Sequence, residues 1–112
     1  LAIPPGGVAV AGELARSLRL QCDVIIAREF RVRLNPAIVA GAIGEAGGLC
    51  LNAAALRHDG LTPQALWEAV VKEQALISGL MRLYRHGRPL PLGVRRPVIL
   101  VDDGLRSGLA QL

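Results

Sequence analysis

Two short apolar runs rich in β-branched residues, 22–27 and 98–101, limit the fold of this chain more than any other feature. Runs of this kind are typical of strands that are buried on both faces of a parallel sheet. The first run comes after an apolar start at 1–3, a proline- and glycine-rich turn at 4–7 and a helical pattern over 8–18. We therefore expect the chain to open with a strand–helix–strand unit.

Further elements are predicted between the two runs. Residues 39–43 and 49–51, separated by a glycine-rich stretch, indicate a hairpin, whereas 29–36 is basic and irregular. A helix is expected to begin after Thr62, whose hydroxyl can cap it, because Pro63 then occupies the first helical position. Its apolar stripe is typical of core packing and consists of Leu66, Val70, Ile77, Met81 and Tyr84.

A chain of 112 residues is long enough for one core, so we treat 1–112 as a single domain. The predicted class is α/β, with a Rossmann-like, mostly parallel sheet and flanking helices. We expect this fold to be incomplete at both ends. The first strand has three residues, and the helix expected after Gly108 has barely begun at Leu112.

Composition excludes several classes of protein. Charged residues interrupt the apolar stretches before the roughly 18 residues that a membrane helix needs, and no signal segment is recognised. Thirteen basic and nine acidic residues give a net charge of +4, which favours an anionic partner or simply reflects the coding composition of the source. Nucleic acid is an unlikely partner, because only three aromatic residues could stack on bases and the arginines are scattered along the chain. We expect a cytoplasmic protein in which Cys22 and Cys50 are buried as small apolar residues.

The second apolar run ends in the feature that indicates chemistry. Asp102 and Asp103 follow it directly, and a loop with Gly104, Ser107 and Gly108 comes next. Ligands of open α/β sheets bind beyond the carboxyl ends of the strands. Backbone N–H groups and a hydroxyl can hold a phosphate there, while the two carboxylates suit vicinal hydroxyls, with magnesium nearby. The alternative is a strand that ends in an ordinary Asp-Asp-Gly turn.

Residues 98–108 resemble the phosphoribosyl pyrophosphate signature of type I phosphoribosyltransferases. The resemblance is strongest to microbial members in which the run reads Val-Asp-Asp-Gly-x-x-Thr-Gly-x-Thr. It extends over nearly the whole chain, through Gly6-Gly7-Val8, Glu13-Leu14-Ala15, Asp23-Val24, Asn35-Pro36, Gly41-Ala42-Ile43, Leu51-Asn52, Tyr84-Arg85 and Gly87-Arg88-Pro89. It implies a Rossmann-like fold, Mg²⁺, and transfer of ribose 5-phosphate to an acceptor with release of pyrophosphate.

The resemblance also assigns site residues. Asp102 and Asp103 would be the catalytic pair, holding the ribose hydroxyls and, through water, the metal. The 5-phosphate would be held by Gly104, Ser107 and Gly108. The glycine turn at Gly6 and Gly7 would receive the pyrophosphate, with Arg28 as a nearby cation. Arg106 would face an anionic acceptor or point into water.

Some positions depart from the family pattern. Members usually have arginine at the position of Pro5 and lysine at that of Glu29, and both changes remove positive charge from the pyrophosphate side. Ala110 replaces a threonine of the phosphate loop. We therefore expect a phosphoribosyltransferase of reduced activity that binds phosphoribosyl pyrophosphate or another sugar phosphate. The alternatives are a non-catalytic regulatory domain that binds a nucleotide or sugar phosphate, and a structural module without ligand. A homodimer is left open.

Overall fold

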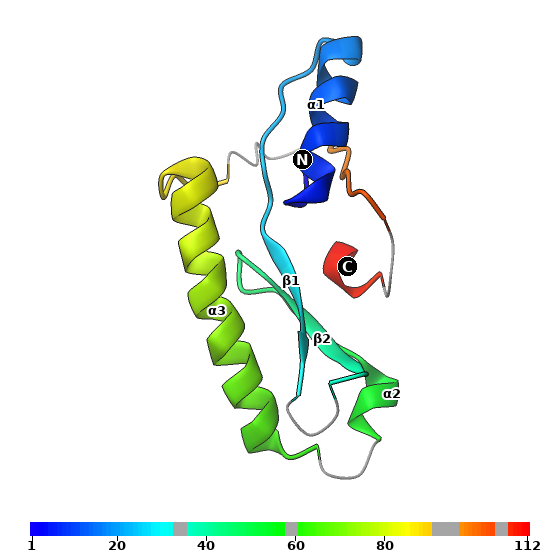
Figure 1. Cartoon of the computed structure of the whole chain (residues 1–112), viewed down its shortest axis with the longest axis vertical. Helices are drawn as coiled ribbons and strands as arrows, with labels where there is room; N and C mark the ends of the chain where they lie inside the picture. Colours follow the sequence, from blue (N-terminus) through cyan, green and yellow to red (C-terminus); the bar gives the residue numbers. More distant parts are fainter. Residues whose placement is uncertain (33–35, 58–60, 91–96, 105–107) are drawn as a thin grey trace.

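The computed structural model describes residues 1–32, 36–57, 61–90, 97–104 and 108–112 (Figure 1). The elements are, in chain order, α1 (Gly6–Leu18), β1 (Ala27–Arg31), β2 (Val39–Gly44), β3 (Leu49–Leu51), α2 (Ala53–Leu56), α3 (Pro63–Arg85) and the short 3₁₀ helix η1 (Leu109–Gln111). The fold is therefore mixed α/β, as the class expected from the sequence requires.

An antiparallel sheet of order β1-β2-β3 forms the centre of the molecule. The pairing of β2 with β3 confirms the predicted hairpin. Residues 29–31, which were expected to be irregular, instead belong to β1, and that expectation is corrected. The reason is tertiary, because Phe30 is 2% exposed in the core beneath α3 while Arg31 points outward.

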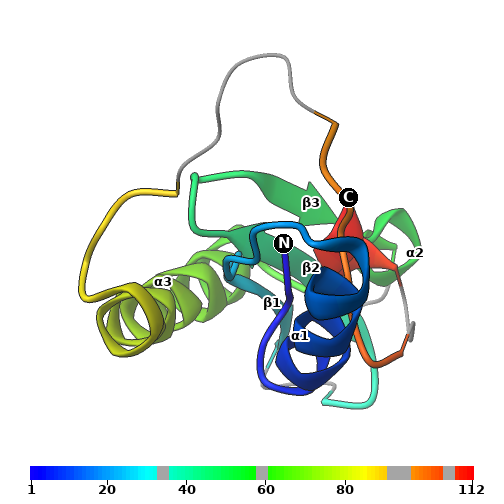
Figure 2. The ribbon, with the colours of Figure 1, turned by 90° about the horizontal axis from the view of Figure 1, so that it is seen from above.

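Helix α3 begins as its sequence predicts. The Thr62 hydroxyl accepts a hydrogen bond from the Ala65 N–H at 3.1 Å, and Pro63 is the first helical residue. At the other end His86 takes the left-handed conformation, with φ of 53°. The helix lies along one face of the sheet (Figures 1 and 2), where Val70 and Ile77 complete the core with the strands.

Three segments outside this sheet run parallel to one another. Ala2 forms isolated parallel bridges with Val24 on one side and Val101 on the other. The order 23–25, 1–3, 99–101 is that of a small parallel sheet. In the described ranges, however, these contacts are single bridges, so they do not amount to a regular parallel sheet.

The expectation that 98–101 is buried is wrong. Val98, Ile99 and Leu100 are 53%, 51% and 40% exposed. The segment is hydrogen-bonded along the edge that faces residues 1–3, and the described elements do not cover its side chains. Cys22 is also exposed, contrary to expectation, while Cys50 is partly buried.

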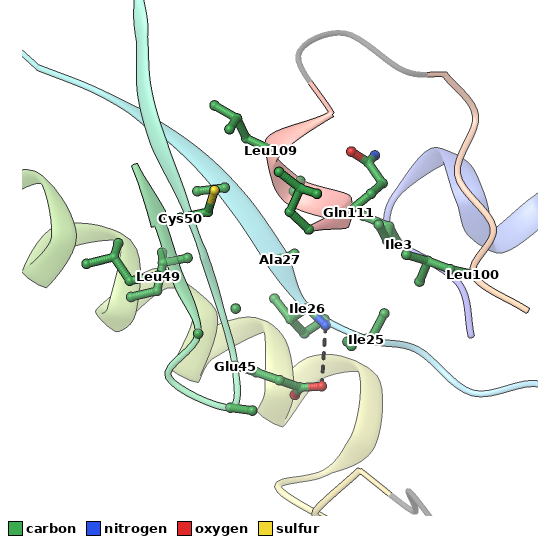
Figure 3. Close-up of a pocket in the computed structure, with 17 residues that line it drawn as sticks. Ile3, Ile25, Ile26, Ala27, Glu45, Leu49, Cys50, Leu100, Leu109 and Gln111 are labelled. Atoms are coloured by element: carbon green, nitrogen blue, oxygen red, sulfur yellow. Dashed lines mark hydrogen bonds between the residues drawn. The ribbon is translucent and has the colours of Figure 1, made fainter. Parts of the chain in front are cut away.

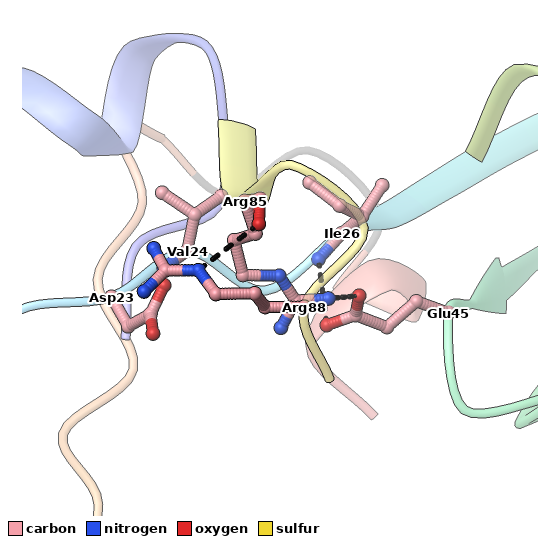
Figure 4. Close-up of polar contacts among 6 residues, drawn as sticks. All are labelled: Asp23, Val24, Ile26, Glu45, Arg85 and Arg88. Atoms are coloured by element: carbon pink, nitrogen blue, oxygen red, sulfur yellow. Dashed lines mark hydrogen bonds and ion pairs between the residues drawn. The ribbon is translucent and has the colours of Figure 1, made fainter. Parts of the chain in front are cut away.

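A buried ion pair joins the end of α3 to the rest of the fold (Figure 4). Arg85 is 1% exposed and pairs with Glu45, in the turn between β2 and β3. The other oxygen of Glu45 accepts a hydrogen bond from the Ile26 N–H at 3.4 Å. One carboxylate therefore holds together a helix end, a strand turn and the segment that leads into β1.

No helix among the described residues has the length and apolar character needed to cross a membrane.

Candidate functional site

The glycine turn and the aspartate pair, which the resemblance assigned to one ligand, lie against each other in the structure. A Cβ atom added to Gly6 would lie 1.8 Å from Oδ2 of Asp103. One added to Gly7 would lie 2.6 Å from the Val101 carbonyl oxygen and 3.0 Å from the Asp102 Cα. The start of α1 can approach the end of the 99–101 segment this closely because Gly7 has no side chain, whereas the neighbour of Gly6 is a side chain.

Backbone hydrogen bonds hold this junction in place. The Val101 N–H donates to the Leu1 carbonyl at 2.8 Å, and the Ile3 N–H donates to the Val101 carbonyl at 2.9 Å. The Gly7 N–H donates to the Ile3 carbonyl at 3.0 Å. Residues 102–103 therefore emerge beside the first turn of α1.

The two carboxylates have different surroundings. Asp102 is partly buried, and both of its oxygens accept hydrogen bonds, Oδ1 from the Asp103 N–H at 2.8 Å and Oδ2 from Gln111 Nε2 at 2.7 Å. Asp103 is exposed, and its carboxylate lies against Gly6. A carboxylate near a helix N-terminus is electrostatically favourable, and α1 has no acidic residue of its own in its first turn.

The α1 N-terminus offers fewer amide donors than the sequence suggested. Gly7 already donates to Ile3, and the Val8 N–H makes a long contact of 3.4 Å with the Pro5 carbonyl. Pro5 is the N-cap residue and makes no side-chain cap. Among the described residues, the N–H of Gly6 is the donor of this turn that has no intramolecular acceptor.

The remaining predicted residues are placed as follows. Arg28 forms an ion pair with Glu73 of α3, with 2.5 Å between Nε and Oε2, so its guanidinium is directed to that helix. Gly104 is exposed at the end of the aspartate pair. Gly108, with φ of 76°, is the N-cap of η1. Arg106 and Ser107 lie outside the described residues.

An apolar cavity of about 480 Å³ is lined by residues that do not include Asp102 or Asp103 (Figure 3). It lies between the sheet and η1, which contacts β1, β2 and β3. Gln111 contributes to its lining and also donates to Asp102. Sequence reasoning missed Gln111, because the family signature ends at position 110 and the contact with Asp102 depends on how η1 is placed.

Within the described ranges, no cluster of three or more histidine, cysteine, aspartate or glutamate residues could hold a metal ion. Two neighbouring carboxylates nevertheless fit Mg²⁺, which often binds one or two carboxylates and completes its shell with substrate phosphates and water.

Two proteins of Mycobacterium tuberculosis resemble this chain in sequence, and both carry the name "Putative phosphoribosyl transferase". They are MT0597 of strain CDC 1551 / Oshkosh and Rv0571c of strain ATCC 25618 / H37Rv. Each is 37% identical over 110 residues, which cover 96% of this chain and 24% of the relative. The chain thus spans about a quarter of the length of these curated relatives. No model of a protein family matches it.

A solved structure shares the fold. The protein TT1426 from Thermus thermophilus superposes with a TM-score of 0.74 at 34% sequence identity. The alignment covers 98% of this chain and 52% of TT1426. The arrangement of α1, the antiparallel strands and α3 is therefore found in a protein about twice as long.

Proposed function

We propose that this chain is a phosphoribosyltransferase-like unit that binds phosphoribosyl pyrophosphate or a related sugar phosphate between α1 and the loop after Val101. The observation that carries the proposal is the meeting of Gly6 and Gly7 with Asp102 and Asp103. These two pairs lie near opposite ends of the sequence, and the family resemblance assigns both of them to one ligand. The names of the mycobacterial relatives support the same class.

The arrangement suits a sugar that carries phosphates. Carboxylate oxygens of Asp102 and Asp103 accept hydrogen bonds from vicinal hydroxyls, and the Gly6 N–H with the α1 dipole attracts the pyrophosphate. The carboxylate of Asp103 lies at the same helix end and would repel that pyrophosphate. A cation is needed between them, so we assign Asp102 and Asp103 to Mg²⁺, which would neutralise the phosphates when bound.

In the proposed reaction the bond between the ribose anomeric carbon and pyrophosphate breaks, and a bond to the acceptor forms. The protein's task is to orient the ribose and stabilise the leaving group. The Rossmann-like parallel sheet also belongs to this proposal. In this proposal, the parallel segments around Val24, Ala2 and Val101 are three neighbouring strands of that sheet. The ligand would bind at the carboxyl ends of these strands.

A second function is favoured by the charges at the pyrophosphate side. Pro5 has no N–H and no charge at the cap of α1, and Arg28 is paired with Glu73. A site with few cations holds a ribose phosphate better than it promotes departure of pyrophosphate. A regulatory domain that binds a nucleotide or sugar phosphate without turnover is therefore the alternative.

Titration calorimetry and thermal unfolding with phosphoribosyl pyrophosphate and Mg²⁺ test the proposal. Ligand at 100 times its dissociation constant should raise the free energy of unfolding by about 2.7 kcal/mol. Release of pyrophosphate with a panel of purine, pyrimidine and amine acceptors separates the enzyme from the sensor. Asp103→Asn should weaken binding, whereas Glu68→Gln on the exposed side of α3 should not. Absence of binding by the parent protein would refute the proposal.

A further inference from the structure

Gln111 connects the aspartate pair to the C-terminal helix η1. Its Nε2 donates to Oδ2 of Asp102 at 2.7 Å, while the Asp103 N–H occupies Oδ1 at 2.8 Å. Among the residues that the structure describes, Gln111 thus supplies one of the two donors to the Asp102 carboxylate. The other donor is a neighbouring backbone group that the local turn already fixes.

The amide of Gln111 is held in one orientation. Its Oε1 is buried and has no hydrogen-bond partner in the described part of the chain. Rotating the amide by half a turn would direct this oxygen at the carboxylate of Asp102, where two acceptors repel each other. A buried acceptor without a partner is unfavourable, so the charge-assisted bond to Asp102 is the interaction that keeps the side chain in place.

We propose that Gln111 is the positioning residue for Asp102 in sugar binding. The inference rests on the proposed function, because it assigns Gln111 to the same site. Each carboxylate oxygen has a second lone pair, so Asp102 can accept from ribose hydroxyls while Gln111 and the Asp103 N–H hold it. Figure 3 shows Gln111 on η1, among the residues that line the cavity.

A purely structural role would have a different signature. If Gln111 only fixed η1 to the sheet, its removal would lower stability and weaken all ligands alike. If Gln111 orients Asp102, its removal should weaken the contacts of the protein with the sugar hydroxyls. The contacts with the phosphate should not change. The preference for ribose 5-phosphate over 2-deoxyribose 5-phosphate distinguishes these roles, since the two sugars differ by one hydroxyl.

The matched pair of variants is Gln111→Met and Gln64→Met. Gln64 makes the same kind of bond on the surface of α3, from Nε2 to Oε1 of Glu68 at 3.2 Å. Methionine keeps the length of the side chain and removes the donor. Calorimetric titrations with ribose 5-phosphate, 2-deoxyribose 5-phosphate and inorganic phosphate, all with Mg²⁺, give the affinities.

We expect Gln111→Met to weaken the binding of ribose 5-phosphate by about tenfold, the smaller end of what the loss of a residue supporting a metal ligand costs. The preference over 2-deoxyribose 5-phosphate should largely disappear, and inorganic phosphate should bind unchanged. Gln64→Met should resemble the parent. In the Asp102→Asn background, Gln111→Met should have a smaller effect, because the two residues act as one unit.

The possible failures are distinguishable. If the parent prefers ribose 5-phosphate and Gln111→Met keeps that preference, the positioning role is overturned while the proposed function stands. If Gln111→Met lowers the affinity for all three ligands equally, the positioning role is also overturned, and Gln111 has a structural role. A parent that binds none of them overturns both.

Should Gln111→Met fail to fold, the side-chain amide resonances of Gln111 supply a second reading in a folded protein. They should shift in Asp102→Asn and on addition of ribose 5-phosphate to the parent. Resonances that respond to neither change would overturn the role.

Discussion

Gly6 and Gly7 are adjacent in α1, yet an added methyl group should affect them in different ways. At Gly7 the new Cβ would meet the backbone of Val101 and Asp102, which cannot move without breaking the parallel bridges. At Gly6 it would meet the exposed side chain of Asp103, which can rotate away. We expect Gly7→Ala to lower stability by roughly 1 to 3 kcal/mol, the usual cost of overpacking, and Gly6→Ala to leave it nearly unchanged.

Gly12→Ala is the control for this pair, because a Cβ at Gly12 has open space in the same helix. It should raise stability by about 0.5 to 1 kcal/mol. Urea unfolding measures all three variants. Gly6→Ala should instead weaken the binding of ribose 5-phosphate, because the added methyl group displaces the Asp103 carboxylate from the proposed site. Equal stabilities of Gly6→Ala and Gly7→Ala would contradict the geometry of the junction.

At the scale of the elements, the buried pair of Arg85 and Glu45 should matter more than any surface ion pair. Arg85→Met leaves Glu45 buried without its cation, which typically costs about 3 to 5 kcal/mol. Adding Glu45→Leu should recover much of that loss, because it removes the carboxylate that is otherwise left buried without a partner charge. Denaturant titration measures both variants.

The control is the pair of Glu13 and Arg16, whose side chains are 72% and 74% exposed. Arg16→Met should hardly change stability, since solvent screens an exposed pair. A similar loss in Arg16→Met and Arg85→Met would show that burial does not set the strength of these pairs. A double variant less stable than Arg85→Met would argue against the unpaired carboxylate as the cause.

Elements governed by neighbouring residues were predictable from the sequence. The start of α3 depends on Thr62 and Pro63, and the hairpin depends on a glycine-rich turn between two apolar runs. The strand β1 was not predictable in this way, because it is stabilised by Phe30 packing beneath α3. The exposure of Val98 was missed because an apolar run records the tendency to be buried, not the presence of a covering element.

The site followed the same rule. The family resemblance assigned the glycine turn and the aspartate pair to one ligand, and the structure brings the two segments into contact. The partner of Arg28 was not predicted, since Glu73 lies 45 residues later and on α3. Gln111 was missed for a similar reason, because its bond to Asp102 requires the chain to turn back at Gly108.

The whole molecule is elongated, with extents of 49 × 26 × 25 Å. Its radius of gyration is 15.3 Å, against about 13 Å for a compact domain of this length. Figure 1 shows α1 at one end and the sheet with α3 along the other. The buried residues of α1 are Gly7 and Ala11, whereas the core around Phe30, Ile43 and Ile77 belongs to the sheet and α3.

Because α1 lies outside the core formed by the sheet and α3, we expect it to unfold locally more easily than they do. Amides in α1 should exchange with deuterium faster than those in β2 and α3, because α1 buries little apolar surface and lies beside single bridges. The difference should be visible by mass spectrometry under conditions in which the whole protein is folded. Exchange at one common rate throughout would mean that the molecule opens as a single cooperative unit.

A bound ligand should reduce this difference in exchange rate by protecting the end of the molecule that contains α1. Ribose 5-phosphate with Mg²⁺ should slow exchange in the first turn of α1 and around residues 101–104, since the proposed site joins these segments. Exchange in the middle of α3, about Val70 to Ile77, should not change, because that part of the helix packs on the far side of β1 and β2. Inorganic phosphate alone should protect the α1 turn less, because it makes no contact with the aspartates through sugar hydroxyls. Protection that appears in α3 and is absent from α1 would place the ligand in another part of the molecule and remove Gly6 and Asp103 from the site.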